Sequence, residues 1–312
     1  MDSTNAKIKQ AAAALKAGGL VILPTETVYG LAADAADSRA VAAVYAAKGR
    51  PSFNPLIAHV ADVAMARRIA RFDDRAERLA AEFWPGPLTL VLPVADEVAV
   101  CDLARAGLDT VAVRSPAHPL AHALLKAFGG PLVAPSANRS GRPSPTTFAD
   151  AVDETGAAAV VVLDGGACAI GLESTVVSLL GEARLLRPGA VTRAEIEALI
   201  GPLSDAEADA RRSPGRLTRH YAPNLPLRLN VTEPRANEVW LGFGATHWPG
   251  DGAEPFNLSH EGDLAEAAAN LFAYLRAADR SGASGIAVAP IPDTGLGEAI
   301  NDRLRRAAGY VG

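Results

Sequence analysis

Short apolar runs alternate with amphipathic segments along most of the chain. The run Leu20-Val21-Ile22-Leu23 predicts a buried strand. Residues 6–17 carry apolar side chains three and four positions apart, which predicts a helix that packs through one face. Because strands and helices intermix, we expect an α/β fold with a mixed sheet rather than a helical bundle or a sandwich.

The pattern predicts similar elements through the first 200 residues. The expected helices cover residues 6–17, 38–47, 61–71, 73–83, 119–128, 148–154 and 193–200. The expected strands cover residues 20–23, 56–60, 88–94, 110–113, 132–134, 160–163, 174–179 and 184–186. A polar loop is expected at residues 135–147.

Residues 201–225 interrupt this pattern. They contain three prolines and four arginines and few large apolar side chains, which predicts a linker. Beyond it, strands at 227–231, 239–243 and 286–289 and helices at 263–279 and 296–308 predict a small α/β domain. We therefore expect a catalytic domain at residues 1–200, a linker at 201–225 and a C-terminal domain at 226–312. The length of 312 residues suits two domains of ordinary size.

Charge and composition exclude some classes of protein. The net charge of −5 argues against a basic nucleic-acid binder. No run of 18 apolar residues occurs and the first residues lack a signal-peptide core, so we expect a cytoplasmic protein without a membrane span. Cys101 and Cys168 are the only cysteines, and we expect two reduced thiols.

Several common catalytic motifs are absent from the sequence. There is no Gly-x-x-x-x-Gly-Lys-[Ser/Thr] phosphate loop, no Gly-x-Gly-x-x-Gly after the first strand, no His-Glu-x-x-His and no Gly-x-Ser-x-Gly. His118 and His122 could share a helix face, but no cysteine or carboxylate motif accompanies them. We therefore predict no resident metal site and no covalent serine catalysis.

Two polar segments lie next to the first predicted strands, one after the strand at 20–23 and one before the strand at 56–60. Residues 25–30, Thr-Glu-Thr-Val-Tyr-Gly, could hold a small polar ligand through threonine hydroxyls, or form an ordinary turn. Lys48 and Arg50, in a turn stiffened by prolines, could bind phosphate or be solvated cations. We expect both segments to lie at the ends of neighbouring strands and to face one crevice.

Two further polar segments lie later in the chain. Residues 135–144 combine serines, glycine and arginines before a helix, which is typical of an anion site but also of a surface loop. Residues 171–175, with 186–189, form the fourth segment. Together the four segments predict a pocket for a small polar molecule and a polyphosphate, without a P-loop.

Five ordered motifs carry a resemblance to a known family. They are Pro24-Thr25-Glu26-Thr27-Val28-Tyr29-Gly30-Leu31, Lys48-x-Arg50 with Asn54-Pro55-Leu56, Trp84-Pro85-Gly86-Pro87-Leu88-Thr89, Ala134-Pro135-Ser136-Ala137-Asn138 and Glu173-Ser174-Thr175-Val176. This set resembles the YrdC-like domain of threonylcarbamoyl-AMP synthases. Residues 213–223 resemble the linker of the two-domain form of that family.

The resemblance implies a fold and an activity. The implied fold is a twisted mixed sheet with helices around a concave pocket, plus a small Rossmann-like C-terminal α/β domain. The implied reaction makes threonylcarbamoyl-AMP and pyrophosphate from L-threonine, bicarbonate and ATP, with Mg²⁺. A downstream transferase complex then modifies the adenosine beside the tRNA anticodon, so direct tRNA binding is expected to be weak at most.

The resemblance also implies roles for particular residues. The implied catalytic set around the phosphates is Lys48, Arg50, Ser136 and Asn138. The implied threonine contacts are Thr27, His59, Arg114, Ala134 and Ser174, with Arg114 pairing with the threonine carboxylate. The implied ATP contacts are Arg50, Asn54, Thr110, Ser136, Ser144, Arg187 and Tyr221, with His220 as a further candidate from a lid-like linker. No side chain stands out as a general base.

Two alternative functions compete with this one. An RNA-binding module is disfavoured by the net charge of −5. A carbamoyltransferase of the hydrogenase-maturation type would need zinc-finger and acylphosphatase-like regions, for which two cysteines and this length leave no room. In the C-terminal domain, residues 293–297 could cap a helix or bind an anion.

Overall fold

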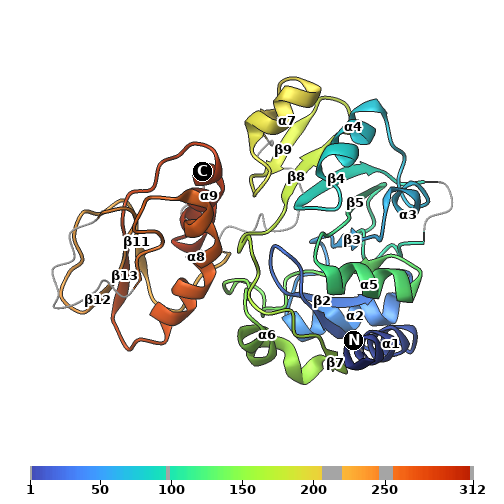
Figure 1. Ribbon diagram of the computed structural model, residues 1–312, viewed down its shortest axis with the longest axis horizontal. Coiled ribbons are helices and arrows are strands. Elements are labelled where there is room, and N and C mark those ends of the chain that lie inside the picture. Colours follow the sequence, from blue (N-terminus) through green and yellow to red (C-terminus); the bar gives the residue numbers. More distant parts are fainter. Residues whose placement is uncertain (1, 96–98, 206–219, 246–255, 310–312) are drawn as a thin grey trace.

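The protein has two α/β bodies of unequal size (Figure 1). The computed structural model describes residues 2–95, 99–205, 220–245 and 256–309. Strands and helices intermix in both bodies, which confirms the predicted fold class. No helix in these ranges is long and apolar enough to cross a membrane. Cys101 and Cys168 are both free thiols.

Most helices lie close to their predicted positions. They are α1 (Asp2–Lys16), α2 (Ser38–Lys48), α3 (Val63–Arg67), α4 (Asp74–Phe83), α5 (Pro119–Phe128), α6 (Phe148–Thr155), α7 (Arg193–Ile200), α8 (Leu264–Asp279) and α9 (Leu296–Ala307), with a short 3-10 turn at Gly156–Ala158. Side-chain caps begin several of them, since Asp37, Asp62, Asp73, Thr147 and Thr192 each accept a hydrogen bond from a backbone N–H of the first turn.

One predicted helix is much shorter than expected. The helix expected at 61–71 is confined to α3, because the backbone after it pairs with the end of a strand. The N–H of Arg71 donates to the carbonyl of Pro93 over 2.9 Å, and the N–H of Ala95 donates to that of Ile69 over 3.1 Å. The N–H of Ala70 still donates to the carbonyl of Ala66, but from Arg71 onward the backbone pairs with the end of β4 (Leu88–Pro93) instead of continuing the helix.

Within the described residues, ten strands form one mixed sheet and three form a second, parallel sheet. The strands are β1 (Val21–Leu23), β2 (Gly30–Asp34), β3 (Ile57–His59), β4 (Leu88–Pro93), β5 (Thr110–Arg114), β6 (Leu132–Val133), β7 (Val161–Val162), β8 (Thr175–Ser178), β9 (Arg184–Arg187), β10 (Ser204–Asp205), β11 (Leu227–Arg228), β12 (Glu238–Leu241) and β13 (Gly285–Val288). The large sheet has the order β10-β9-β8-β4-β5-β3-β6-β2-β1-β7, and the small one β11-β13-β12.

The sheet corrects one prediction about the first strands. The sequence analysis placed no strand between residues 23 and 56, but β2 pairs with β1 in an antiparallel hairpin, with Leu23 opposite Gly30. The threonine-rich segment is the loop of this hairpin. In addition, β1 and β3 are not neighbours, because β2 and β6 lie between them. The sequence Gly-Leu-Ala-Ala-Asp has weak strand propensity, and its position in the sheet, with the first four residues buried, determines its conformation.

The linker predicted at 201–225 is only partly described. Its first residues are part of the large sheet, because β10 pairs in parallel with β9. At its end, the N–H of Ala222 donates to the carbonyl of Gly141 over 2.7 Å. The lid-like behaviour expected of residues 206–219 lies outside the described residues.

A shared apolar cluster joins the two bodies. Leu271 and Phe272 of α8 and Ile300 of α9 are fully buried in it, and Val28 and Leu172 of the larger body belong to the same cluster. In Figure 1, α8 and α9 lie on the side of the small sheet that faces the larger body. The smaller body therefore packs on the larger one through buried side chains rather than being held by the linker alone.

Buried charges cross the same interface. Glu154 of α6, whose side chain is 0% exposed, pairs with Arg276 of α8 over 3.0 Å and with Arg142 over 3.0 Å. It also accepts a hydrogen bond from the N–H of Arg139 over 2.9 Å. Burial raises the pKa of Glu154, but these hydrogen bonds and positive charges outweigh burial and lower it.

We expect Glu154→Gln to lower the free energy of unfolding by about 3 to 5 kcal/mol, because it leaves buried guanidinium charge without its partner. Chemical denaturation followed by circular dichroism measures this change. Glu77→Gln is the matched control, since Glu77 pairs with Arg67 at the surface over 2.8 Å and exposed ion pairs contribute little. Equal losses for the two variants would contradict the assignment.

Candidate functional site

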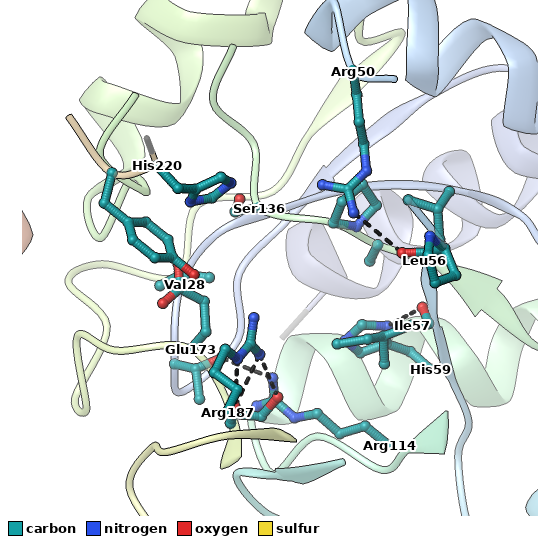
Figure 2. A pocket seen from close by; sticks show the side chains of 16 residues that line it. Val28, Arg50, Leu56, Ile57, His59, Arg114, Ser136, Glu173, Arg187 and His220 are labelled. Atoms are coloured by element: carbon teal, nitrogen blue, oxygen red, sulfur yellow. Dashed lines mark hydrogen bonds between the residues drawn. The ribbon is translucent and has the colours of Figure 1, made fainter. Parts of the chain in front are cut away.

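A cavity of about 510 Å³ opens where the four polar segments meet (Figure 2). The predicted site residues that line it are Thr27, Arg50, His59, Arg114, Ala134, Ser136, Ser174, Arg187, His220 and Tyr221. It is also lined by residues that the sequence analysis did not select, namely Val28, Pro55, Leu56, Ile57, Pro135 and Glu173. The structure therefore brings together all five predicted threonine contacts and part of the predicted nucleotide set.

The other predicted residues lie behind the cavity wall. Lys48 is 3% exposed, and its ammonium donates to the backbone carbonyls of Ser136 and Asn138. The side-chain amide of Asn138 donates to the carbonyls of Arg139 and Arg142 over 2.8 and 2.9 Å. These two predicted catalytic residues brace the loop that carries Ser136, rather than facing the cavity.

Asn54, Thr110 and Ser144 are also buried outside the cavity lining. The carbonyl of Asn54 accepts a hydrogen bond from the Tyr45 hydroxyl over 3.0 Å. Thr110 lies at the start of β5, at the opposite end from Arg114. The hydroxyl of Ser144 donates to the carboxylate of Glu173. The carbonyl of Asn54 also accepts Nε of Arg50 over 3.3 Å, so Asn54 and Ser144 each contact a residue that lines the cavity.

The threonine-rich hairpin loop orders one end of the cavity. The hydroxyl of Thr25 donates to the carbonyl of Val28 over 2.6 Å and lies 2.8 Å from the Thr27 hydroxyl. The N–H of Ala137 donates to the carbonyl of Tyr29 over 2.7 Å, which ties the hairpin to residues 135–147. This closed set of hydrogen bonds fixes the Thr27 hydroxyl at the cavity.

Arg114 is fixed by three groups around this end. Its Nη1 donates to the Thr27 hydroxyl over 2.8 Å, its Nη2 to Glu26 over 2.5 Å and its Nε to the carbonyl of Gly86 over 3.1 Å. Burial raises the pKa of Glu26, but the adjacent Arg114 outweighs burial and keeps the carboxyl ionised. The guanidinium is therefore oriented, and its charge is balanced, before any ligand arrives.

His59 is neutral at this site. Burial, together with the positive charge of Arg114, lowers its pKa to about 3. Its Nδ1 lies 3.1 Å from the carbonyl of Ile57, so the neutral ring donates from that nitrogen. A neutral imidazole beside Arg114 adds no positive charge to this end of the cavity.

Cationic groups also line the rest of the cavity. In Figure 2, Arg50 lies in the upper half, and Arg187 and Arg114 lie in the lower half. Burial lowers the pKa of Arg50 to about 10, so it stays charged at neutral pH. Arg187 donates to the carbonyl of Ser174 over 2.9 Å and to its hydroxyl over 3.2 Å. Such an array suits a ligand with several negative charges.

His220 and Tyr221 bring the end of the linker to the cavity. They are 5% and 1% exposed, and their rings meet edge to face with centroids 4.0 Å apart. Within the described residues, neither the Tyr221 hydroxyl nor Nδ1 of His220 has a hydrogen-bond partner. Buried polar atoms are rarely left unpaired, so both atoms are candidates for ligand contact.

Sequence reasoning missed Glu26 and Glu173, although both lie inside quoted motifs. A carboxylate beside an expected anion site has no obvious role until its arginine partner is known, and those partners are distant in sequence. Glu26 pairs with Arg114, and Glu173 pairs with Arg303 of α9. The available signal was an acidic residue within two of the four polar segments, residues 25–30 and 171–175.

The described residues contain no cluster of three or more histidine, cysteine or carboxylate side chains that could hold a metal ion. His118 instead caps α5, because its Nδ1 accepts the N–H of Leu120 over 3.2 Å. At residues 293–297, Gly295 precedes α9 and provides no side-chain cap.

Comparisons with known proteins find related proteins that match this chain over both bodies. Residues 13–189 match the family described as telomere recombination, and residues 191–309 match the C-terminal domain of threonylcarbamoyl-AMP synthase. The threonylcarbamoyl-AMP synthase of Bacillus subtilis is 39% identical over 332 residues, covering 99% of this chain and 95% of that protein. The Pyrococcus abyssi protein of the same name is 41% identical over 328 residues, covering 97% and 94%. A crystal structure of P. abyssi Sua5 complexed with L-threonine matches with a TM-score of 0.90 and 39% identity, covering 98% and 95%.

Acidification is expected to destabilise the protein through His59. Its pKa falls from 6.5 in the unfolded chain to about 3 in the folded protein, so the unfolded state binds the proton first. Stability is therefore lost as the pH falls below about 6.5, by up to about 2 kcal/mol between about pH 7 and pH 5. Denaturant titrations at both pH values measure the loss.

The His59→Asn variant should lose less stability over this pH range than the unmodified protein. His260→Asn, at an exposed position, is the control and should keep the original pH dependence. A His59→Asn variant with the unmodified pH dependence would contradict the assignment.

Proposed function

This chain belongs to the threonylcarbamoyl-AMP synthase family, and on that premise we propose that it makes threonylcarbamoyl-AMP and pyrophosphate from L-threonine, bicarbonate and ATP. It is an enzyme of the nucleotidyl-transfer type. The observation that supports this proposal best is one cavity that joins the Arg114 end to the Arg50 and Arg187 cations. An amino acid and a polyphosphate chain are the two ligands that such a cavity suits.

At the Arg114 end, the groups match a small hydroxyl-bearing amino acid. Arg114 offers guanidinium N–H groups to a carboxylate, and the hydroxyl oxygens of Thr27 and Ser174 offer acceptors. The neutral ring of His59 does not repel the amino group. A relative was crystallised with L-threonine, which supports this amino acid as the substrate.

At the other end, Arg50, Arg187 and the Tyr221 hydroxyl would contact the phosphates. Ser174, assigned to the amino acid, is linked to the phosphate end, because Arg187 donates to both its carbonyl and its hydroxyl. The hydroxyl of Ser174 also lies 2.7 Å from that of Thr89. This chain of contacts would set the amino acid and the α-phosphate at a fixed separation, which is the main requirement of an in-line reaction.

The proposed chemistry has two steps. The neutral amine of threonine adds to CO₂ derived from bicarbonate, giving a carbamate and releasing a proton. A carbamate oxygen then attacks the α-phosphorus of ATP, and the bond to the bridging oxygen breaks, so that pyrophosphate leaves with the electron pair. The protein's part is positioning and stabilisation of charge, and Arg50 and Arg187 would stabilise the leaving group.

Mg²⁺ is proposed to arrive with ATP rather than to occupy a resident protein site. The two carboxylates nearest the chemistry are already bound, Glu26 by Arg114 and Glu173 by Ser144 and Arg303. Mg²⁺ commonly keeps water ligands and is held by substrate phosphates, so the donor set fits an ATP-borne ion. Such an ion would neutralise phosphate charge.

The product is proposed to pass to a separate transferase complex that modifies the adenosine next to the tRNA anticodon. The net charge of −5 fits weak direct tRNA contact at most. No feature of the described surface favours an RNA-binding function over synthesis of the adenylate.

The proposal predicts that pyrophosphate is released only when ATP, bicarbonate and L-threonine are all present. Mass spectrometry of the same incubation should detect threonylcarbamoyl-AMP. Omission of each substrate in turn is the control. A folded protein that releases no pyrophosphate with all three substrates, or releases it equally without threonine, would contradict the proposed function.

Arg50→Ala is expected to lower kcat/KM for this reaction about 100-fold or more, because it removes a charged donor to the phosphates. Lys48→Ala should also remove most activity, by releasing the carbonyls that hold the Ser136 loop. Steady-state pyrophosphate assays measure both effects. Arg67→Ala, at an exposed position, is the control. Near-normal rates for both site variants would exclude these roles.

A further inference from the structure

One arginine of the smaller body reaches the back of the cavity wall. Arg303 of α9 is 0% exposed and does not line the cavity. Its Nε donates to Oε2 of Glu173 over 2.8 Å, and its Nη2 donates to the carbonyl of Pro188 over 3.0 Å. Glu173 lines the cavity, and Pro188 directly follows Arg187, which also lines it. Arg303 therefore contacts one cavity residue, Glu173, directly, and contacts the residue that follows a second one, Arg187.

Tyr221 is held by the same arginine. The guanidinium carbon of Arg303 lies 5.2 Å from the centroid of the Tyr221 ring, which is a cation–π contact. The ring of Phe272, from α8, lies with its centroid 5.4 Å from that of Tyr221. Tyr221 has a positive φ of 62°, a strained conformation for a non-glycine residue that its surroundings must maintain. Both helices of the smaller body thus fix a tyrosine that lines the cavity.

Arg303 compensates the negative charge of Glu173. Its carboxylate is 7% exposed and lies in a cavity suited to a polyphosphate. An uncompensated carboxylate there would repel the ligand strongly, because charges interact over longer distances where water is scarce. One carboxylate oxygen accepts the Ser144 hydroxyl and the other accepts Arg303. With both oxygens bound, the charge of Glu173 is compensated from outside the cavity by an arginine that does not line it.

The charge of Arg303 is itself fixed from within the smaller body. Its Nη1 donates to Asp302 over 2.6 Å, and Asp302 also accepts Nε of Arg306 over 3.0 Å. Burial lowers the pKa of Arg303, but its surroundings, including Glu173 and Asp302, outweigh burial and raise it. Burial likewise raises the pKa of Glu173, and Arg303 and Arg187 outweigh it and lower it. Both partners are therefore charged at neutral pH.

We propose that Arg303 is a positioning residue of the synthase, which makes the C-terminal domain a part of the nucleotide site by neutralising Glu173 and fixing Tyr221. The inference rests on the proposed function for the identity of the ligand, ATP. Arg303 acts through Glu173 and Tyr221 and touches no reacting atom. Its loss should weaken ATP binding while leaving the Arg114 end, and hence threonine binding, almost unchanged.

Arg303→Met tests the proposal, with Arg305→Met as the matched control. Arg305 lies on the same helix, is half exposed and pairs only at the surface, with Asp293 over 3.6 Å. In steady-state assays, Arg303→Met should raise the KM for ATP at least tenfold and change the KM for L-threonine by less than twofold. Calorimetric titration with ATP alone should give the same loss of affinity without turnover. Arg305→Met should match the unmodified protein in both measurements.

Two further variants separate positioning from general support of the fold. Arg303→Lys keeps the charge but cannot contact Glu173, Asp302 and Pro188 together, so its ATP affinity should lie between those of the unmodified protein and Arg303→Met. Glu173→Gln combined with Arg303→Met removes the unpaired carboxylate and should restore most of the lost ATP affinity. Equal losses for ATP and threonine, or no restoration in the double variant, would overturn the proposal. If Arg303→Met does not fold, Arg303→Lys and the double variant decide by the same criteria.

The outcome can be told apart from failure of the proposed function. If the unmodified protein binds ATP but makes no threonylcarbamoyl-AMP, the proposed synthesis fails, and the calorimetric comparison of Arg303 variants still decides the role of Arg303. If the unmodified protein makes the product and Arg303→Met binds ATP equally well, the positioning role alone fails.

Discussion

Three buried carboxylates, at the cavity and at the interface between the two bodies, each pair with an arginine from a distant part of the chain, and the architecture depends on this pairing. Glu26 is paired with Arg114, Glu154 with Arg276, and Glu173 with Arg303. An ion taken out of water costs several kcal/mol unless a partner and hydrogen bonds compensate it. The hairpin, the sheet and the two C-terminal helices are therefore held in the one arrangement that pairs all of these charges.

Pairing of this kind also prepares the cavity for its ligands. Arg114 is oriented by Glu26 and the Thr27 hydroxyl, and Arg187 is oriented by Ser174. The ligands need not order these side chains on arrival, which reduces the entropic cost of binding and of the reaction. Lys48 contributes in the same way from behind the wall, by holding two carbonyls of the loop that presents Ser136.

The sequence predicted the fold class, most elements and many of the residues that line the cavity, since these depend on local periodicity and on recognisable motifs. It failed where long-range pairing decides the outcome. The strand β2 was missed because its alanines have weak strand propensity and its position in the sheet compensates. Glu173 was not selected because its partner Arg303 lies 130 residues further along the chain. Lys48 and Asn138 carry predicted catalytic roles, but local sequence could not reveal that they face backbone carbonyls.

The apolar cluster shared by the two bodies has a consequence for biogenesis. Val28 and Leu172 are synthesised well before α8 and α9, which cover them. At ordinary translation rates the delay between Leu172 and Arg303 is on the order of ten seconds. During that interval the apolar side chains of Val28 and Leu172 lack the helices that cover them, and Glu173 lacks Arg303. We therefore expect the cavity wall to reach its final arrangement only after α8 and α9 have been synthesised.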